Sequence, residues 1–203
     1  TILFNAACEP HVQDLCMMLN AMGAQITGIG TNRLGIQGVD ALHGVSHRVS
    51  PDYIDTATFA AAAVLTGGEM QIENVREDDL AVIGRPFRKL GVSWALHDGV
   101  LSLPAGQRLR VHDAFGSAVP KIEDGIWPSV PSDLLSLLIV MATQASGTVL
   151  FFEKLFESRL YFVDRLIEMG ARIVPCDPHR ILVTGPARLR GMRVSSPDIR
   201  AGM

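Results

Sequence analysis

The strongest constraint on the fold is a short pattern that recurs three times along the chain. Each copy ends a predicted helix at a glycine, in the segments Leu-Asn-Ala-Met-Gly-Ala at 19–24, Arg-Lys-Leu-Gly-Val at 88–92 and Ile-Glu-Met-Gly-Ala at 167–171. Each glycine precedes an aspartate that opens another predicted helix, after 29 residues from Gly23 to Asp52, 42 from Gly91 to Asp133 and 28 from Gly170 to Asp198. Such recurrence indicates supersecondary units that bury their apolar faces against neighbouring copies.

Apolar periodicity and helix-breaking residues divide the copies into helices and short strands. The predicted helices run from Glu9-Pro10 to Gly23 and over Ala57–Leu65, Leu80–Leu90, Leu134–Ala142 and Leu160–Met169. The predicted strands are Thr1–Phe4, Gln25–Ile29, Leu34–Gln37, Glu69–Val75, Val92–Leu96, Val100–Leu103, Thr148–Phe152, Arg172–Pro175 and Ile181–Thr184. The sequence therefore predicts an α/β fold of repeated strand–helix–strand–strand–helix units, with apolar helices inside short-stranded sheets. The pattern begins and stops within a unit, so we expect the chain to be incomplete at both ends.

The middle copy is longer than the others by about 13 residues, which precede Asp133. An insertion confined to one copy of a repeat usually forms a loop on the functional face. We expect the stretch Ile122–Pro131 to be irregular, because it holds three residues that break helices and central strands. These residues are Gly125, Pro128 and Pro131. Pro131-Ser132-Asp133 then predicts a helix start, and Glu157-Ser158-Arg159 is predicted to open the next helix.

Three aspartates at predicted helix starts are candidates for both structure and chemistry: Asp52, Asp133 and Asp198. Each can act as an N-cap, which contributes on the order of 1 kcal/mol to stability. Repetition favours capping for Asp52 and Asp198. Asp133 differs because it follows the insertion, so general-base catalysis and capping stay equally open for it.

A run of arginines late in the chain indicates affinity for an anion. From Arg159 to Arg200 the chain holds eight arginines and no lysine. Arg159 and Arg200 are both predicted near helix starts, where the helix dipole disfavours a cation, so we interpret them as contacts for an anionic ligand. Glu157 suits a helix start electrostatically, and capping is its default interpretation.

Composition narrows the classes of function. The formal charge of −3 gives no reason to expect nucleic acid or an anionic membrane as a partner. The three cysteines have no CxxC spacing and the six histidines no metal-binding spacing, so we expect free thiols, no metal and no cofactor. No apolar run reaches the roughly 18 residues of a membrane span, and no signal peptide is visible, so we expect a cytoplasmic protein.

A set of short motifs resembles those of the enolpyruvyl transferases, in kind and in order. The motifs are Glu9–Leu15, Gly28–Asn32, Pro51–Asp55, Pro131–Asp133, Phe156–Arg159 and Pro197–Ala201. The similarity covers almost all of the 203 residues, which correspond to about the second half of such an enzyme. It is greatest for the members of the family that act on UDP-N-acetylglucosamine.

The resemblance implies an inside-out α/β barrel of two domains, with residues 1–47 as the last part of the first domain and 48–203 as most of the second. The crossover would fall near His47–Pro51. UDP-N-acetylglucosamine and phosphoenolpyruvate would bind between the domains, and the enolpyruvyl group would pass to the sugar 3-hydroxyl, the first committed step of peptidoglycan synthesis. The family's proton-donating cysteine loop would lie in the missing N-terminal part, so Cys8, Cys16 and Cys176 receive no catalytic role.

The resemblance also implies roles for single residues. Asp133 would lie by the 3-hydroxyl as the catalytic base, and Arg159 and Arg200 would lie at the anionic end of the site. Three further substrate-binding residues are implied: Leu155 through its backbone, Glu157, and Asp52 near the hinge.

The chain departs from the usual residues of the family at four positions: Tyr53 for Arg, Leu134 and Leu135 for Met-Gln, and Ser158 for Asn. The loss of an arginine and two amides keeps two alternatives open. One is an enolpyruvyl transferase with another acceptor, such as 3-phosphoshikimate. The other is a non-catalytic repeat protein that binds an anionic partner through its arginine-rich third copy.

Overall fold

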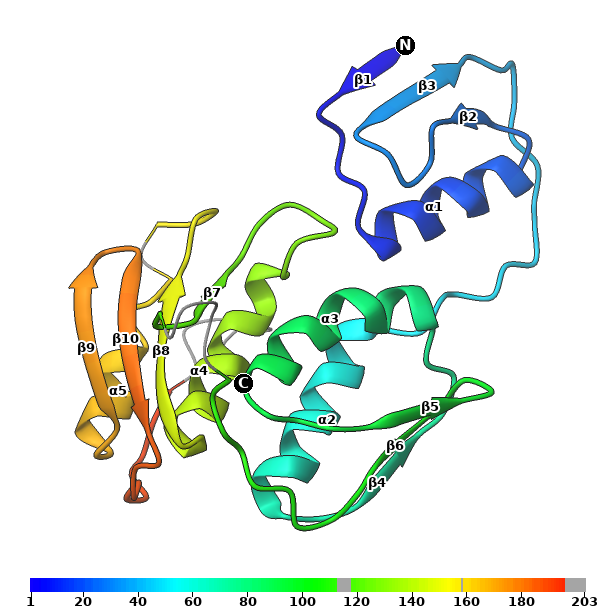
Figure 1. Cartoon of the computed structure of the whole chain (residues 1–203). Coiled ribbons are helices and arrows are strands. Elements are labelled where there is room, and N and C mark those ends of the chain that lie inside the picture. The colour runs from blue at the N-terminus through cyan, green and yellow to red at the C-terminus, as the bar shows by residue number, and fades with distance from the viewer. Residues whose placement is uncertain (113–117, 158, 196–203) are drawn as a thin grey trace. The chain divides into compact units, whose positions relative to one another are not determined.

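The computed structural model describes residues 1–112, 118–157 and 159–195 (Figure 1). The chain forms two compact units. The first unit comprises Thr1–Asp52 with Ile126–Pro128, and the second comprises Tyr53–Gly125 with Ser129–Met203.

The first unit is a three-stranded antiparallel sheet and one helix. Strands β1 (Ile2–Phe4), β2 (Gln25–Thr27) and β3 (Arg33–Gln37) lie in the order β1-β3-β2. Helix α1 (Pro10–Ala21) starts at a proline, which suits the first helical turn, and is followed by Gly23 at φ +102°. The core of this unit is apolar and consists of Cys16, Ile26 and Leu34, with Val12, Leu19 and Ile36 packed around them.

A polar contact fastens the last segment of the first unit to its helix. Asp14 on α1 is buried, and its Oδ1 atom accepts a hydrogen bond of 2.7 Å from the hydroxyl of Ser50 and lies 3.2 Å from His47 Nε2. The hydrogen bond from Ser50 lowers the pKa of the Asp14 carboxyl, and the contact with His47 acts in the same direction. The segment that leads out of this unit is therefore held against α1.

The first half of the second unit is a pair of helices with a second three-stranded sheet. Helices α2 (Tyr53–Thr66) and α3 (Glu77–Lys89) pack on each other. Strands β4 (Met70–Ile72), β5 (Ala95–His97) and β6 (Val100–Leu103) form an antiparallel sheet in the order β4-β6-β5. Four alanines of α2 are buried, and their small side chains allow neighbouring elements to approach closely: Ala57, Ala60, Ala61 and Ala63.

The second half of this unit holds a four-stranded sheet around a buried helix. Its elements are β7 (Lys121–Glu123), η2 (Ser132–Leu134), α4 (Leu135–Gln144), β8 (Gly147–Phe152), α5 (Val163–Glu168), β9 (Arg172–Asp177) and β10 (Arg180–Gly185). The strand order is β7-β8-β10-β9, with β7 parallel to β8 and the other pairs antiparallel. Every residue of α4 is buried or half-buried, because the helix packs against β8, β10 and α2.

The three sheets share one connectivity. In each, a strand leads into a helix, a hairpin follows, and the second strand of the hairpin returns to pair with the first strand. This arrangement joins β1 to β3, β4 to β6 and β8 to β10. The sheet around α4 differs by the added edge strand β7, which comes from the long middle insertion.

Most predicted elements are present, with shifted ends. Helix α2 begins four residues before the predicted Ala57, and the predicted strand Glu69–Val75 is reduced to β4. The prediction of a wholly irregular Ile122–Pro131 was wrong, because β7 includes Ile122 and Glu123. A three-residue edge strand carries too few residues to show a period-2 pattern.

The prediction that Glu157–Arg159 opens a helix was also wrong. Helix α5 begins only at Val163, and a turn precedes it. In this turn Val163 N donates to Leu160 O at 3.1 Å, a bond that spans three residues rather than four. In the part of the chain that the structure describes, no helix is long and apolar enough to cross a membrane.

Gly185, the last residue of β10, provides a test of the packing around α4. A Cβ atom there would come within 2.5 Å of the carbonyl oxygen of Ala142 and closer still to that of Ala145. We expect Gly185→Ala to lower the free energy of unfolding by about 1–3 kcal/mol, because backbone must move. Gly191→Ala is the matched control, since its Cβ would meet nothing within 4 Å. Urea unfolding of both variants measures the difference, and equal midpoints would contradict this packing.

Candidate functional site

An ion pair joins the start of η2 to the turn that follows β8. Arg159 Nη2 donates a hydrogen bond of 2.9 Å to Asp133 Oδ1. Arg159 Nη1 donates a second bond, of 2.5 Å, to the hydroxyl of Ser132. The guanidinium thus bridges two consecutive residues of η2. The side chains keep 22% (Arg159) and 35% (Asp133) of their surface exposed, so the pair is accessible from solvent.

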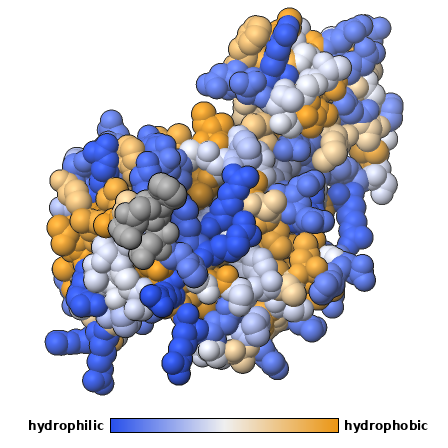
Figure 2. Space-filling view, in the orientation of Figure 1, coloured by the Kyte–Doolittle hydropathy of each residue, from blue (hydrophilic) through white to orange (hydrophobic). Residues whose placement is uncertain are grey.

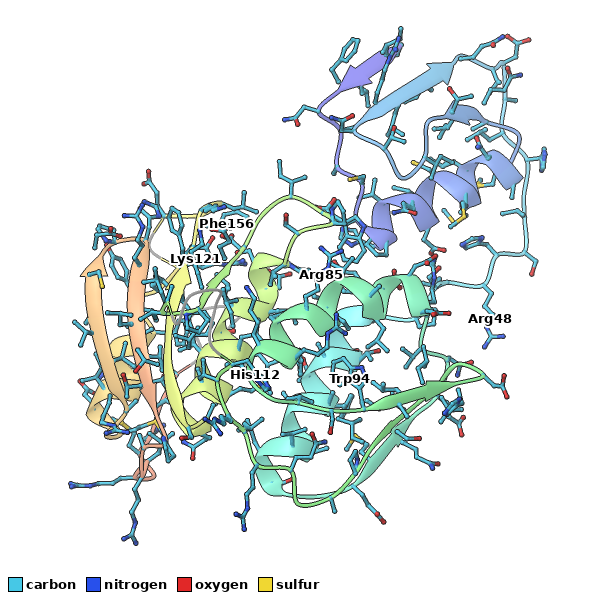
Figure 3. All side chains as sticks on the ribbon, in the orientation of Figure 1. Arg48, Arg85, Trp94, His112, Lys121 and Phe156 are labelled. Atoms are coloured by element: carbon cyan, nitrogen blue, oxygen red, sulfur yellow. The ribbon has the colours of Figure 1, made fainter. Side chains whose placement is uncertain are left out.

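The ring of Phe156 supports the arginine from one face. The Arg159 Cζ atom lies 4.6 Å from the centre of this ring, which is within the range of a cation–π contact. Phe156 lies on the loop that leaves β8 (Figure 3) and is itself 51% exposed. On the face shown in Figure 2, hydrophilic residues border patches of hydrophobic ones. A guanidinium whose plane is held by hydrogen bonds is suited to bind a carboxylate or a phosphate.

Two interpretations made from the sequence need correction. Asp133 is the second residue of η2, and the N-cap position belongs to Pro131, so Asp133 is a first-turn residue and not the N-cap. Arg159 lies four residues before α5, so no helix dipole acts on it there. Its position is explained instead by its hydrogen bonds to Asp133 and Ser132.

A buried carboxyl group lies behind the ion pair. The hydroxyl of Ser132 donates to the Glu153 carboxyl group. It lies 3.0 Å from Oε2 and 3.2 Å from Oε1. Glu153 Oε1 also accepts the backbone N–H groups of Leu155 and Phe156, each at 3.1 Å. Only 1% of Glu153 is exposed. Its carboxyl group therefore connects the helix start with the backbone of the turn after β8.

A second buried carboxyl, that of Asp124, lies beside the first. Asp124 follows β7, is 1% exposed, and accepts the backbone N–H of Lys154 at 2.5 Å. Burial first, and then the hydrogen bond and the charge of Asp124, raise the pKa of Glu153 to about 7. Glu153 therefore retains its proton at pH values where an exposed glutamate has lost its own.

Sequence reasoning missed Glu153 and Asp124, although the alternation along β8 was a signal for Glu153. In β8 the inward positions are Val149 and Phe151, and Glu153 continues this period of two. Asp124 continues the inward position of Ile122 in the same way, and Ile122 is the partner of Phe151 in the parallel pairing. The two acids therefore lie side by side just beyond two neighbouring strands.

The remaining predicted site residues are distributed as follows. Leu155 and Glu157 are exposed on the turn after β8, close in sequence to Arg159. Asp52 ends the first unit, directly before α2. Asp198 and Arg200 lie outside the described residues.

Metal ligation and the Cys8 thiol are the next features to consider within the described ranges. No group of three or more His, Cys, Asp or Glu side chains there could hold a metal ion. Burial raises the pKa of the Cys8 thiol, and its Sγ atom donates to the carbonyl of Trp127 at 3.2 Å. A thiol of this kind is a poor nucleophile.

A separate depression of about 760 Å³ lies beside the sheet β4-β6-β5. Trp94, labelled in Figure 3, lines it together with Gln71 and Pro104. None of its lining residues belongs to the group around Asp133 and Arg159, so this depression is not part of the candidate site.

Comparison with known proteins gives consistent matches over the whole chain. A family model described as EPSP synthase (3-phosphoshikimate 1-carboxyvinyltransferase) matches residues 1–203. The UDP-N-acetylglucosamine 1-carboxyvinyltransferase of Treponema pallidum (strain Nichols) is 52% identical over 203 residues, which are 100% of this chain and 48% of that protein. The protein of the same name from Bradyrhizobium diazoefficiens is 49% identical, over 100% of this chain and 47% of its own length. The chain thus spans about half the length of the curated relatives it matches.

Solved structures show the same fold. The enolpyruvyl transferase NikO from Streptomyces tendae has a TM-score of 0.82 at 24% identity, over 99% of this chain and 46% of that chain. EPSP synthase from Acinetobacter baumannii has a TM-score of 0.62 at 18% identity, over 100% of this chain and 48% of that chain. The α/β fold expected from the sequence is confirmed as the fold of these enzymes.

The pKa of Glu153 predicts a pH dependence of stability. The folded chain holds this proton up to about pH 7, whereas the unfolded chain releases it near the ordinary value of 4.5. Stability is therefore greatest below the lower value and falls as the pH rises through the upper one. We expect the free energy of unfolding to decline between about pH 5 and pH 8, and Glu153→Gln to flatten this decline, because an amide does not titrate.

Urea unfolding at several pH values measures this slope. Glu168→Gln serves as the control, because Glu168 is an exposed partner of Arg165 on α5. Parallel slopes for the wild type and Glu153→Gln would show that Glu153 does not retain its proton in the folded chain.

Proposed function

Because the chain belongs to the EPSP synthase family of carboxyvinyltransferases, we propose that it forms part of an enzyme that transfers an enolpyruvyl group from phosphoenolpyruvate to the 3-hydroxyl of UDP-N-acetylglucosamine. The choice of acceptor rests on relatives that are named for this activity. Their sequences are about half identical to this chain, 52% in one case. The reaction would serve peptidoglycan precursor synthesis in the cytoplasm, and with it cell shape and division.

The observation that carries this proposal is the ion pair of Asp133 and Arg159. Enolpyruvyl transfer needs a base at the acceptor hydroxyl, cations at the phosphate and carboxylate of phosphoenolpyruvate, and an acid for its methylene carbon. A partly exposed carboxylate 2.9 Å from a guanidinium supplies the first two kinds of group at one place. The acid is proposed to come from the part of the enzyme that the relatives have beyond the matched half.

The proposed division of labour combines this ion pair with the roles that the family resemblance implies. Asp133 removes the proton of the 3-hydroxyl, and Arg159 and Arg200 neutralise the phosphate or carboxylate of phosphoenolpyruvate. Leu155, Glu157 and Asp52 contact UDP-N-acetylglucosamine; for Leu155 the support is its place on the turn that also holds Arg159.

The architecture of the longer enzyme is also a proposal. We propose that residues 1–47 complete a first domain and residues 48–203 form most of a second, with both substrates between them. The repeated sheet connectivity supports an inside-out α/β barrel built from copies of one unit. Activity is then expected of the full-length enzyme rather than of this half by itself.

A different acceptor is the second candidate. The family model is described by a 3-phosphoshikimate enzyme, and the chain departs from the usual residues at Leu134 and Leu135. Both leucines are buried, at 0% and 2% exposure, so they change the packing below the site rather than its surface. A panel of acceptors that includes 3-phosphoshikimate separates the two candidates.

Asp133→Asn tests the base. We expect kcat for phosphate release by the full-length enzyme to fall by about 10²–10⁴-fold, because an amide cannot take the hydroxyl proton. Affinity for UDP-N-acetylglucosamine is expected to change by less than about tenfold, since Asn keeps the size and one acceptor oxygen. Phosphate release and calorimetric binding are the measurements, and undiminished turnover would remove Asp133 from this role.

Arg159→Ala tests the cation. We expect kcat/KM for phosphoenolpyruvate to fall by about 100-fold, which corresponds to the loss of a charged hydrogen bond of about 3 kcal/mol. Arg165→Ala is the matched control, because the Arg165 ion pair with Glu168 is exposed; it should stay within about twofold of the wild type. Equal effects of the two variants would contradict the assignment.

The same variants address the non-catalytic alternative. An anion-binding repeat protein would release no phosphate, and its ligand binding would be unchanged by Asp133→Asn but would weaken strongly as salt is added. That combination would replace the enzymatic proposal.

A further inference from the structure

Glu153 and Ser132 have no place in the chemistry outlined above, yet they lie directly behind it. Glu153 is 1% exposed, so a substrate cannot reach its carboxyl group. Burying a carboxyl is costly unless hydrogen bonds compensate for the loss of water. The Glu153 carboxyl accepts hydrogen bonds from three donors: the hydroxyl of Ser132 and the backbone N–H groups of Leu155 and Phe156.

The hydroxyl of Ser132 connects this carboxyl with the arginine of the site. It donates to Glu153 at 3.0 Å and accepts from Arg159 Nη1 at 2.5 Å. Because the serine proton is directed at Glu153, the lone pairs of its oxygen face the guanidinium. The second contact of the guanidinium, at Asp133 Oδ1, then fixes its plane.

The same carboxyl also shapes the turn that carries the arginine. Its bonds to Leu155 and Phe156 fix the backbone just after β8, and Phe156 places its ring 4.6 Å from Arg159 Cζ. Asp124 holds the preceding peptide through Lys154 N. One buried group therefore restrains Arg159 from two directions, through Ser132 and through the turn.

We propose that Glu153 is a positioning residue of this site, which acts through Ser132 and the turn Lys154–Phe156 to hold the Arg159 guanidinium in the orientation that receives the anionic substrate. The inference rests on the function proposed above. It goes further by giving the buried carboxyl a part in the reaction without contact with a substrate.

The charged and titratable groups around Glu153 come from several elements. Asp124 approaches from the end of β7, Arg159 and Asp133 lie beyond Ser132, and the ring Nδ1 of His179 lies 3.0 Å from the backbone oxygen of Glu153. The raised pKa of Glu153, which follows from burial first and Asp124 second, agrees with a group enclosed by protein.

A double-mutant cycle in the full-length enzyme tests the proposal. We expect Ser132→Ala to lower kcat by about tenfold, as the loss of one charge-assisted hydrogen bond would. In the Arg159→Ala background the same change should cost less than about twofold, because no guanidinium remains to be positioned. Ser132→Thr keeps the hydroxyl and should stay within about threefold of the wild type. Ser136→Ala, at a buried serine one turn further along, is the matched control.

The cycle separates positioning from general support of the fold. A tenfold loss in both backgrounds would overturn the proposal, because Ser132 would then act independently of Arg159. So would a Ser132→Ala enzyme with unchanged turnover. Urea unfolding of each variant checks that the fold persists, and the Ser132 cycle decides the question even if Glu153→Ala does not fold.

Amide hydrogen exchange supplies a readout that needs no turnover. We expect Glu153→Ala to accelerate exchange at Leu155 and Phe156 by about tenfold or more, because both N–H groups lose their acceptor. Glu153→Gln keeps one acceptor oxygen and should restore most of the protection. Faster exchange in an enzyme that never releases phosphate would disprove the proposed function alone, whereas unchanged exchange would disprove the positioning role.

Discussion

The enclosure of helix α4 is the constraint on which the rest of the second unit depends. Leu138, Ile139 and Met141 have 0% exposure, and every other residue of the helix is at least half-buried. A helix that is apolar on nearly all sides has no face to turn to water, so it must be surrounded. The surroundings are β8 and β10 on one side and α2 on another. The close approach at Gly185, where only hydrogen fits beside two backbone carbonyls, is a direct consequence.

The candidate site follows from how this helix begins. Two polar residues precede this buried helix, in the single turn of η2. In this chain the polar residues are Ser132 and Asp133, and the sheet that encloses the helix delivers Glu153 and Arg159 to the same place. The rim of the core thus carries a row of hydrogen-bonded acids and donors, which runs from Glu153 through Ser132 and Arg159 to Asp133. The end of this row at Asp133 and Arg159 is partly exposed to solvent, and the end at Glu153 is buried.

Features encoded within a few residues could be predicted from the sequence, whereas features that depend on distant residues could not. The elements around Gly23, Gly91 and Gly170 could be predicted, because a helix that ends at a glycine is encoded within a few residues; all three have positive φ. Strand β7 could not, because its three residues are ordered only by pairing with β8. The misplaced helix start at Glu157–Arg159 has a related cause. The polar residues there resemble a cap, but Arg159 is bonded to η2 instead. The nearness of Asp133 and Arg159 was inferred from motif order, and the structure supplies the bond.

The sequence by itself determined the α/β class, the burial of the helix after Asp133, and the membership of an enzyme family through short motifs in a set order. These properties depend on residue type and spacing, which a single chain displays directly. Tertiary structure alone decided which polar groups meet. Asp124 and Glu153 are 29 residues apart and become neighbours only because two strands pair in parallel with one register. Register sets which side chains share a face, and no local property of either acid specifies it.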